Sequence, residues 1–237
     1  RPEKTLVIVR VGENPASKLY ISLKLKFAEA FGIKAREVLF SPGELIDAID
    51  KLNADNEVGG IIIQLPLPEG LDRDLVAGRI APEKDVDGFS YILNHHDAPI
   101  PPTVRAIEEL MNFYRIVPNQ VLIVGGGFLV GRPLLKYLKS KKIPAEILEK
   151  DDQQYYEKLK SANTVILATG GGGNFNASNF QDGATVIDAS TVSEDNSIKG
   201  DIAPTDDDGR INIAPVPGGV GPITVACLFR NFFDLNK

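Results

Sequence analysis

The stretch Gln120-Val-Leu-Ile-Val-Gly-Gly-Gly-Phe-Leu-Val-Gly-Arg-Pro133 decides the fold of the second half of this chain. Its first five residues predict a buried strand, and a helix is expected after the glycines, to about residue 138. A strand, a glycine-rich turn and a helix in this order are typical of a Rossmann-type unit. The backbone N–H groups of the turn and the helix N-terminus would then receive a pyrophosphate.

The next predicted strand, residues 145–148, ends at Glu149. An acidic residue at this place binds both ribose hydroxyls of NAD and repels the 2′-phosphate of NADP. A solvated strand end is the other interpretation of Glu149. The glycine spacing is Gly-x-Gly-x-x-x-Gly, which is ambiguous as a bare motif. The candidate cofactor-binding residues of this region are Gly125, Gly126, Gly127, Val130, Gly131 and Glu149.

The first half of the chain also alternates strands and helices, which predicts a second α/β unit. Apolar runs predict strands at residues 5–10, 36–40 and 59–64. Helices are expected at residues 18–31, with Ser17 as the N-cap, and at residues 42–53.

Lys24 stands out in the first predicted helix. Tyr20, Leu23, Lys24, Phe27 and Phe31 share one arc of a 3.6-residue wheel, so a cation lies on the apolar arc. One interpretation is a lysine that snorkels at the edge of this face. The other is a desolvated amine whose pKa is lowered toward neutrality, which suits acid–base chemistry.

Two further places carry polar residues where ligands bind in α/β folds. Gln64 ends the apolar run 59–63, at the carboxyl end of a strand. Asp85 and Asp87 flank Val86 in a short loop. They are either turn-making side chains or carboxylates that accept hydrogen bonds from a heterocyclic amine.

The segment Pro215-Val-Pro-Gly-Gly-Val-Gly-Pro222 has three prolines and three glycines, which hold a specific non-repetitive backbone. Its glycines leave N–H groups that a ligand can approach. A rigid turn before a last helix, residues 223–234, is the alternative, with Pro222 near the first helical turn.

Bulk composition excludes several classes of protein. A formal charge of −6 leaves no basic footprint for nucleic acid, and no apolar run approaches membrane-spanning length. The single cysteine, Cys227, rules out an internal disulfide and predicts a cytoplasmic location, and no metal-ligand spacing is present. A strand pattern begins at Thr5, so we expect that an N-terminal element is lacking, either naturally or through cloning.

Four stretches, in order, resemble the bifunctional methylenetetrahydrofolate dehydrogenase/cyclohydrolase family. They are Tyr20-Ile-Ser-Leu-Lys24, Gly60-Ile-Ile-Ile-Gln-Leu-Pro-Leu-Pro68, Lys84-Asp-Val-Asp-Gly-Phe89 and Pro215-Val-Pro-Gly-Gly-Val-Gly-Pro222. The second and fourth are strong signatures, whereas the Tyr-x-x-x-Lys spacing is weak by itself. The likeness covers nearly the whole chain.

The resemblance implies roles for individual residues. Lys24 matches the catalytic lysine, and Gln64 the glutamine that helps to hold its protonation state. Tyr20 matches the tyrosine that stacks on the aminobenzoate ring, and Asp87 the aspartate that binds the pterin. The resemblance also implies that Pro217, Gly218 and Gly219 adjoin the substrate. Thr169 and Gly170 would adjoin the nicotinamide. A merely flexible loop is the alternative for Thr169-Gly-Gly-Gly-Gly173.

The chain departs from the family in its cofactor motif. Gly126 and Gly127 stand where the family has Arg-Ser, and that arginine commonly binds the extra phosphate of NADP. Near Glu149 the family's NADP users carry His-Ser. Both departures favour NAD over NADP as the cofactor. Degraded cofactor binding is the opposing interpretation.

We therefore expect an α/β protein of two domains with a cleft between them. Residues 1–114 would form the folate-binding catalytic domain, with the helix 223–237 packing back on it, and 115–222 a Rossmann-type NAD(P)-binding domain. The resemblance implies oxidation of methylenetetrahydrofolate and hydrolysis of the methenyl form in one-carbon metabolism, which serves purine biosynthesis. It also implies a homodimer. A cyclohydrolase without cofactor binding and a non-catalytic folate-binding protein are the alternatives.

Overall fold

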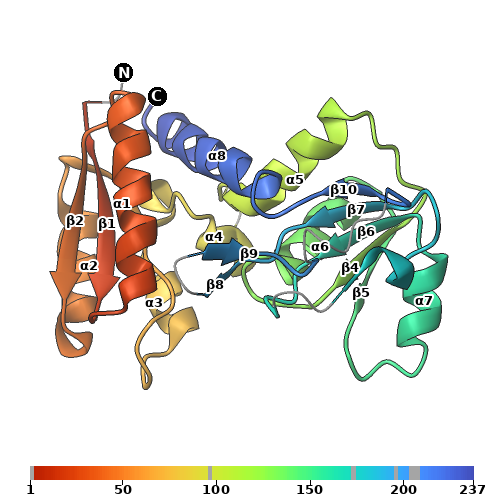
Figure 1. The fold of residues 1–237 in the computed structure, drawn as a ribbon. Coiled ribbons are helices and arrows are strands. Elements are labelled where there is room, and N and C mark those ends of the chain that lie inside the picture. The colour runs from red at the N-terminus through yellow and green to blue at the C-terminus, as the bar shows by residue number, and fades with distance from the viewer. Residues whose placement is uncertain (1–2, 96–97, 172–174, 195–196, 203–208) are drawn as a thin grey trace. The chain divides into compact units, whose positions relative to one another are not determined.

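The computed structural model of the chain describes residues 3–95, 98–171, 175–194, 197–202 and 209–237 (Figure 1). It divides the chain into two compact units. Unit 1 comprises Arg1–Pro102 and Val225–Lys237, and unit 2 comprises Thr103–Thr224. The sequence placed the boundary after residue 114. The helix α5 (Pro102–Phe113) is instead grouped almost entirely with unit 2.

Unit 1 is built on a three-stranded parallel sheet in the order β2-β1-β3. Its strands are β1 (Thr5–Val11), β2 (Ala35–Phe40) and β3 (Val58–Ile63). Every residue of β3 is buried, as its continuous apolar run predicts for a parallel strand covered on both faces. The predicted ends of the three strands differ from the observed ones by at most one residue.

Helices or 3₁₀ turns follow each strand of unit 1 along the chain. They are α1 (Pro15–Ala30), the 3₁₀ turn η1 (Pro42–Glu44), α2 (Leu45–Ala54), α3 (Arg73–Arg79), the 3₁₀ turn η2 (Pro82–Lys84) and α4 (Phe89–Ile92). Figure 1 shows α1 along one face of the sheet and α2 along the other. The sequence predicted α1 and α2, but it did not predict α3 or α4.

Two expectations about α1 were wrong. Its N-cap is Asn14, whose side chain accepts a hydrogen bond from the Ser17 backbone N–H, so Ser17 lies inside the helix. The predicted apolar arc is also not the buried face. Phe27 and Phe31 are exposed, whereas Ile21 and Ala28 enter the core. Because apolar residues occur around most of this helix, the wheel does not select one face.

The core of unit 1 joins the sheet to the end of the last helix, α8 (Val220–Leu235). Leu6 and Ile8 alternate onto one face of β1, where they pack with Phe229 and Phe232 of α8. Buried Asn231 in the same helix donates hydrogen bonds to the carbonyl oxygens of Val86 and Ile100, at 3.0 and 2.9 Å. Residues 225–235 of α8 therefore belong to the core of unit 1.

Unit 2 contains a five-stranded parallel sheet in the order β10-β7-β6-β4-β5. Its strands are β4 (Val121–Val124), β5 (Ala145–Leu148), β6 (Thr164–Leu167), β7 (Thr185–Asp188) and β10 (Asn212–Ala214). A separate antiparallel hairpin pairs β8 (Val192–Glu194) with β9 (Ser197–Lys199). The strands predicted at residues 120–124 and 145–148 correspond to β4 and β5.

The helical elements of unit 2 are α5, α6 (Gly131–Ser140), α7 (Tyr155–Ser161) and the 3₁₀ turn η3 (Ala177–Asn179). α7 was not predicted. The order of the strands reverses between β4 and β6. From β4 the chain first adds β5 on one side of β4 and then adds β6 on the other side. Doubly wound sheets bind ligands at the carboxyl ends of strands at such a switch point.

Candidate active site

The side chains of Lys24 and Gln64 meet in unit 1. Lys24 comes from α1 and Gln64 directly follows β3. The Lys24 Nζ donates a hydrogen bond to the Gln64 Oε1 at 3.0 Å. The Gln64 Nε2 donates to the Leu65 carbonyl oxygen at 2.8 Å, which leaves the amide oxygen facing the lysine. Gln64 is 8 % exposed, so its orientation is fixed by its surroundings.

Asp87 shares the electrostatic environment of Lys24. Burial lowers the pKa of Lys24, and the negative charge of Asp87 opposes this shift. Burial raises the pKa of Asp87 to about 6, against the effect of the Lys24 charge. An amine with a lowered pKa beside a carboxyl group that titrates near pH 6 can exchange protons with a substrate at neutral pH.

Tyr20 precedes Lys24 by about one helical turn on α1 and is half-buried. Burial raises the pKa of its phenol group, so it stays protonated over the neutral range. Tyr20 and Lys24 thus come from successive turns of one helix face.

The neighbouring aspartate, Asp85, has a structural role. It is fully buried, and its Oδ2 accepts a hydrogen bond from the Ser90 backbone N–H at 2.6 Å. This bond supplies a partner for an N–H group in the first turn of α4. Of the two interpretations considered for the aspartate pair, turn formation applies to Asp85, whereas Asp87 remains partly accessible.

Unit 2 has a pocket at its topological switch point, with a volume of about 420 Å³. The carboxyl ends of β4, β5 and β6 all border it. Its lining residues are Val124, Gly125, Gly126, Gly127, Leu148, Glu149, Lys150, Tyr155, Ala168, Thr169 and Gly171. The glycine-rich turn and the acidic strand end predicted from the sequence therefore lie on the wall of one pocket.

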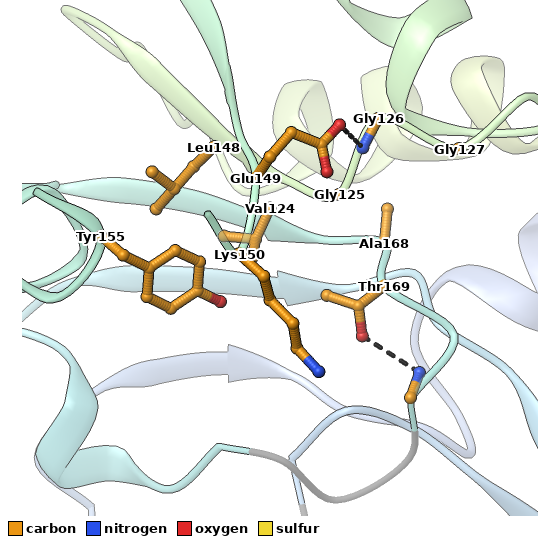
Figure 2. A pocket seen from close by; sticks show the side chains of 11 residues that line it. Val124, Gly125, Gly126, Gly127, Leu148, Glu149, Lys150, Tyr155, Ala168 and Thr169 are labelled. Atoms are coloured by element: carbon orange, nitrogen blue, oxygen red, sulfur yellow. Dashed lines mark hydrogen bonds between the residues drawn. The ribbon is translucent and has the colours of Figure 1, made fainter. Parts of the chain in front are cut away.

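Glu149 bonds directly to the glycine-rich turn. Its Oε1 accepts a hydrogen bond from the Gly126 backbone N–H at 3.0 Å (Figure 2). A Cβ atom at Gly126 would overlap this carboxylate oxygen. The Glu149 carboxylate can therefore lie this close to the turn only because residue 126 carries no side chain.

Not every predicted cofactor residue reaches the pocket wall. Val130 and Gly131 begin α6 behind the turn, and a Cβ at Gly131 would overlap the Gly125 carbonyl oxygen. The Gly170 N–H donates to the Ser190 Oγ at 3.0 Å. These three residues shape the pocket from outside its lining. Gly172 and Gly173 lie outside the described residues.

Sequence reasoning missed Lys150 and Tyr155, which Figure 2 shows on the side of the pocket away from Gly126. Lys150 adjoins the recognised Glu149, and that adjacency was the available signal. Tyr155 starts α7, and no motif marks it.

The proline–glycine segment 215–222 lies in unit 2 up to its junction with α8, which begins at Val220. Pro222 falls in the first turn of that helix, as predicted. The Val216–Pro217 peptide bond is cis, and Gly218 has φ +110°. Gly218 and Gly219 line a second cavity of about 970 Å³, together with residues of α5 and β10.

Among the described residues, no group of three His, Cys, Asp or Glu side chains could hold a metal ion. Across the same residues, no helix has the length and apolar character needed to span a membrane.

The parallel sheet of unit 2, its glycine-rich turn and the acidic end of β5 define a nucleotide-binding α/β protein, of the class that includes nicotinamide-dependent dehydrogenases. The profile of the tetrahydrofolate dehydrogenase/cyclohydrolase catalytic domain matches residues 1–87, and that of the family's NAD(P)-binding domain matches residues 101–237. The chain belongs to the tetrahydrofolate dehydrogenase/cyclohydrolase family.

Individual relatives agree with this assignment. The Bifunctional protein FolD of Ligilactobacillus salivarius is 37% identical over 243 residues, which cover 97% of this chain and 85% of the relative. The crystal structure of the bifunctional enzyme FolD from Campylobacter jejuni has a TM-score of 0.90 at 30% identity, covering 99% of this chain and 88% of that one. The Trypanosoma brucei enzyme, solved with NADP and an inhibitor, has a TM-score of 0.86 at 26% identity and covers 99% and 86%.

The chain is thus a bifunctional enzyme of one-carbon folate metabolism, a methylenetetrahydrofolate dehydrogenase and methenyltetrahydrofolate cyclohydrolase that uses NAD(P). This assignment replaces the cyclohydrolase without cofactor binding and the non-catalytic folate-binding protein considered above. The expected family and two-domain α/β fold are confirmed.

Proposed function

We propose that Lys24 is the catalytic residue of the cyclohydrolase reaction, and that Gln64 and Asp87 set its protonation. The 3.0 Å bond from Lys24 to Gln64, formed by an amine whose burial lowers its pKa, carries this proposal. The neutral amine would take a proton from the water that attacks the methenyl carbon. Gln64 can accept a hydrogen bond from the amine without adding a charge that would hold it as ammonium.

The same side chains would bind the folate. Tyr20 offers a half-buried aromatic face, one helical turn from Lys24, on which the aminobenzoate ring can stack. Asp87 is the partly accessible carboxyl group of the aspartate pair and would accept hydrogen bonds from the pterin. We include Pro217, Gly218 and Gly219 among the substrate-binding residues because of the family resemblance of their segment.

A substitution of Lys24 tests this assignment. Lys24→Met removes the amine but keeps the length and apolar stem of the side chain, so folate binding should remain measurable. Hydrolysis of methenyltetrahydrofolate should fall by about a hundredfold or more. Lys26→Met changes an exposed lysine of the same helix and serves as the control. Unchanged hydrolysis in the Lys24 variant would remove Lys24 from the catalytic role.

We also propose that the switch-point pocket of unit 2 binds the nicotinamide cofactor, which accepts a hydride from methylenetetrahydrofolate when bound. Gly125, Gly126 and Gly127 provide backbone without side chains, which a pyrophosphate can approach closely. Val130 and Gly131 hold the turn against the start of α6. Thr169 and Gly170 would shape the nicotinamide end. For hydride transfer the protein mainly has to align two carbon centres.

Within this proposal NAD is the preferred cofactor. The Glu149 carboxylate lies at the end of β5, where it can accept hydrogen bonds from two ribose hydroxyls. A 2′-phosphate there would meet a like charge. Lys150 lines the same pocket and would attract a phosphate, so it is the one feature of the described lining that favours NADP.

Formation of the methenyl chromophore with NAD and with NADP tests the preference. The wild type should turn over NAD with the higher kcat/KM. In Glu149→Gln the NAD/NADP ratio should fall by about tenfold, because the repulsion is removed while the side-chain size is kept. Lys150→Ala should raise the ratio. A wild type that uses only NADP would refute the preference and leave the family assignment standing.

We finally propose a cytoplasmic homodimer that associates through unit 2. Phe113 and Tyr114, at the end of α5, are 77% and 65% exposed beside the larger cavity, and a second copy could cover them. Light scattering should give twice the chain mass, and Phe113→Asp should lower it to that of a monomer. A monomeric wild type would contradict this proposal. The single cysteine, Cys227, supports the cytoplasmic location, because a reducing compartment requires no disulfide.

A further inference from the structure

Two buried carboxyl groups and a serine lie behind the pocket of unit 2. Asp188 ends β7, Ser190 follows it by two residues, and Asp201 comes after the hairpin β8–β9. Asp188 and Asp201 have no exposed surface, and Ser190 is 3% exposed. None of the three lines the pocket, and none has a role in the reaction as described so far.

Asp188 fixes the backbone of the other two residues. Its Oδ1 accepts a hydrogen bond from the Ser190 N–H at 3.0 Å. Its Oδ2 accepts from the N–H groups of Asp201, at 2.7 Å, and Ile202, at 3.0 Å. Burial raises the pKa of Asp188 to about 6, and these three N–H groups oppose that rise. Asp188 thereby brings Ser190 and Asp201 to one place.

Ser190 and Asp201 in turn hold residues 169–171. The Thr169 N–H and hydroxyl donate to the two carboxylate oxygens of Asp201, at 3.1 and 2.8 Å. The Gly171 N–H donates to the Asp201 Oδ1 at 3.1 Å, and the Gly170 N–H to the Ser190 Oγ at 3.0 Å. The Ser190 hydroxyl donates to the Asp201 Oδ2. Three consecutive backbone N–H groups are therefore bound by one buried pair.

The loop held in this way is a wall of the pocket, because Thr169 and Gly171 line it. Two of its residues are glycines, and Gly170 has φ +64°, so the loop has little intrinsic preference for one backbone shape. Ser190 and Asp201 supply the bonds that select its shape. A buried polar network in which the donors and acceptors are matched restrains the backbone.

We propose that Ser190 and Asp201 are positioning residues that set the affinity of the unit 2 pocket for the nicotinamide cofactor through the loop 169–171, without touching the cofactor. The inference rests on the proposed function of that pocket. Ser190 and Asp201 should therefore affect the dehydrogenase reaction alone, because hydrolysis of the methenyl form requires no nicotinamide.

Ser190→Ala is the principal test, because it removes one donor and one acceptor at little cost in volume. Calorimetry should show the Kd for NAD raised about tenfold, as expected for lost buried hydrogen bonds. The KM for NAD should rise similarly, while the KM for methylenetetrahydrofolate and the cyclohydrolase rate stay within about twofold. Ser190→Thr, which keeps the hydroxyl, should recover most of the affinity. The control Ser161→Ala removes an exposed hydroxyl of the same unit.

Asp201→Asn keeps the shape of the side chain but removes the carboxylate that accepts hydrogen bonds from four donors, so we expect a larger loss of NAD affinity, about a hundredfold. Retained cyclohydrolase activity will show whether each variant is folded. Equal NAD affinity in the wild type and in a folded Ser190→Ala would overturn the inference. Glu149→Lys reverses the charge proposed to adjoin the ribose. If this variant binds NAD as tightly as the wild type does, the proposed cofactor pocket is refuted.

Discussion

At the scale of single residues, the hydrogen bond between Lys24 and Gln64 means that a change of charge at residue 64 should shift the pKa of Lys24. Gln64→Glu would place a carboxylate where the amide oxygen now lies, 3.0 Å from the Lys24 Nζ. A nearby negative charge favours the ammonium form and raises the pKa of Lys24. The pH at which hydrolysis reaches half of its maximal rate should move upward by about one unit or more.

A pH–rate profile of kcat/KM for methenyltetrahydrofolate would measure this shift. Gln153→Glu adds the same charge at an exposed site of unit 2 and should leave the profile in place. An unmoved profile in Gln64→Glu would mean that Lys24 does not act as the neutral amine.

Asp87 gives a second prediction at this scale, on stability. Its pKa in the folded protein, about 6, lies above its ordinary value of 3.8, so the folded state binds this proton more tightly than the unfolded chain. The resulting stabilisation is complete below pH 3.8 and is lost as the pH rises through 6. Asp87→Asn cannot ionise. It should therefore exceed the wild type in free energy of unfolding at pH 8, by about 1 kcal/mol after allowance for solvent screening.

Urea unfolding of the wild type and Asp87→Asn at pH 4.5 and pH 8 would measure this difference, which should shrink at the lower pH. Asp151→Asn alters an exposed aspartate and is the control. A variant that is equally destabilised at both pH values would show that the carboxylate is needed for structure.

At the scale of elements, the start of α6 and the glycine-rich turn are packed backbone to backbone. A Cβ at Gly131 would overlap the Gly125 carbonyl oxygen, so Gly131→Ala must push the turn away from the helix. We expect NAD-dependent activity to fall by about tenfold or more, while cyclohydrolase activity persists, because the change lies in unit 2. Gly43→Ala, whose added methyl meets open space, should be neutral in both assays.

How far the sequence predicts an element depends on its pattern. The apolar runs of β1, β3 and β4 were recognised because parallel strands buried on both faces need them. The buried face of α1 was predicted wrongly, because a helix with apolar residues around its circumference gives the wheel no direction. The short helices α3, α4 and α7 were missed, since fewer than eight residues carry little periodicity.

The site shows the same limit. Motifs gave Lys24, Gln64 and Glu149. The Asp201 N–H donates to Asp188 and the Thr169 N–H donates to Asp201, and both bonds join residues that are far apart in the sequence. Such pairs follow from the order of strands in the sheet. No local spacing in the sequence encodes them.

At the scale of the whole molecule, the two proposed ligands should protect different backbone segments. Hydrogen exchange with NAD should slow the backbone amides near residues 124–127, 148–150 and 168–171, which border the pocket of unit 2. A folate analogue should slow those near Lys24, Gln64 and Asp87. Protection by NAD that is confined to unit 1 would contradict the assignment of ligands to units.

The division of the chain also has a consequence for biosynthesis. Unit 2 is one continuous segment, Thr103–Thr224, whereas unit 1 needs Val225–Lys237 to complete its core. A ribosome therefore delivers all of unit 2 before Phe229 and Phe232 emerge to cover Leu6 and Ile8. The N-terminal segment of unit 1, up to Pro102, must wait with part of its apolar surface uncovered until residues 225–237 are made. Unit 2 should thus complete its fold first, and chaperones should engage the N-terminal segment of unit 1 until residues 225–237 have emerged.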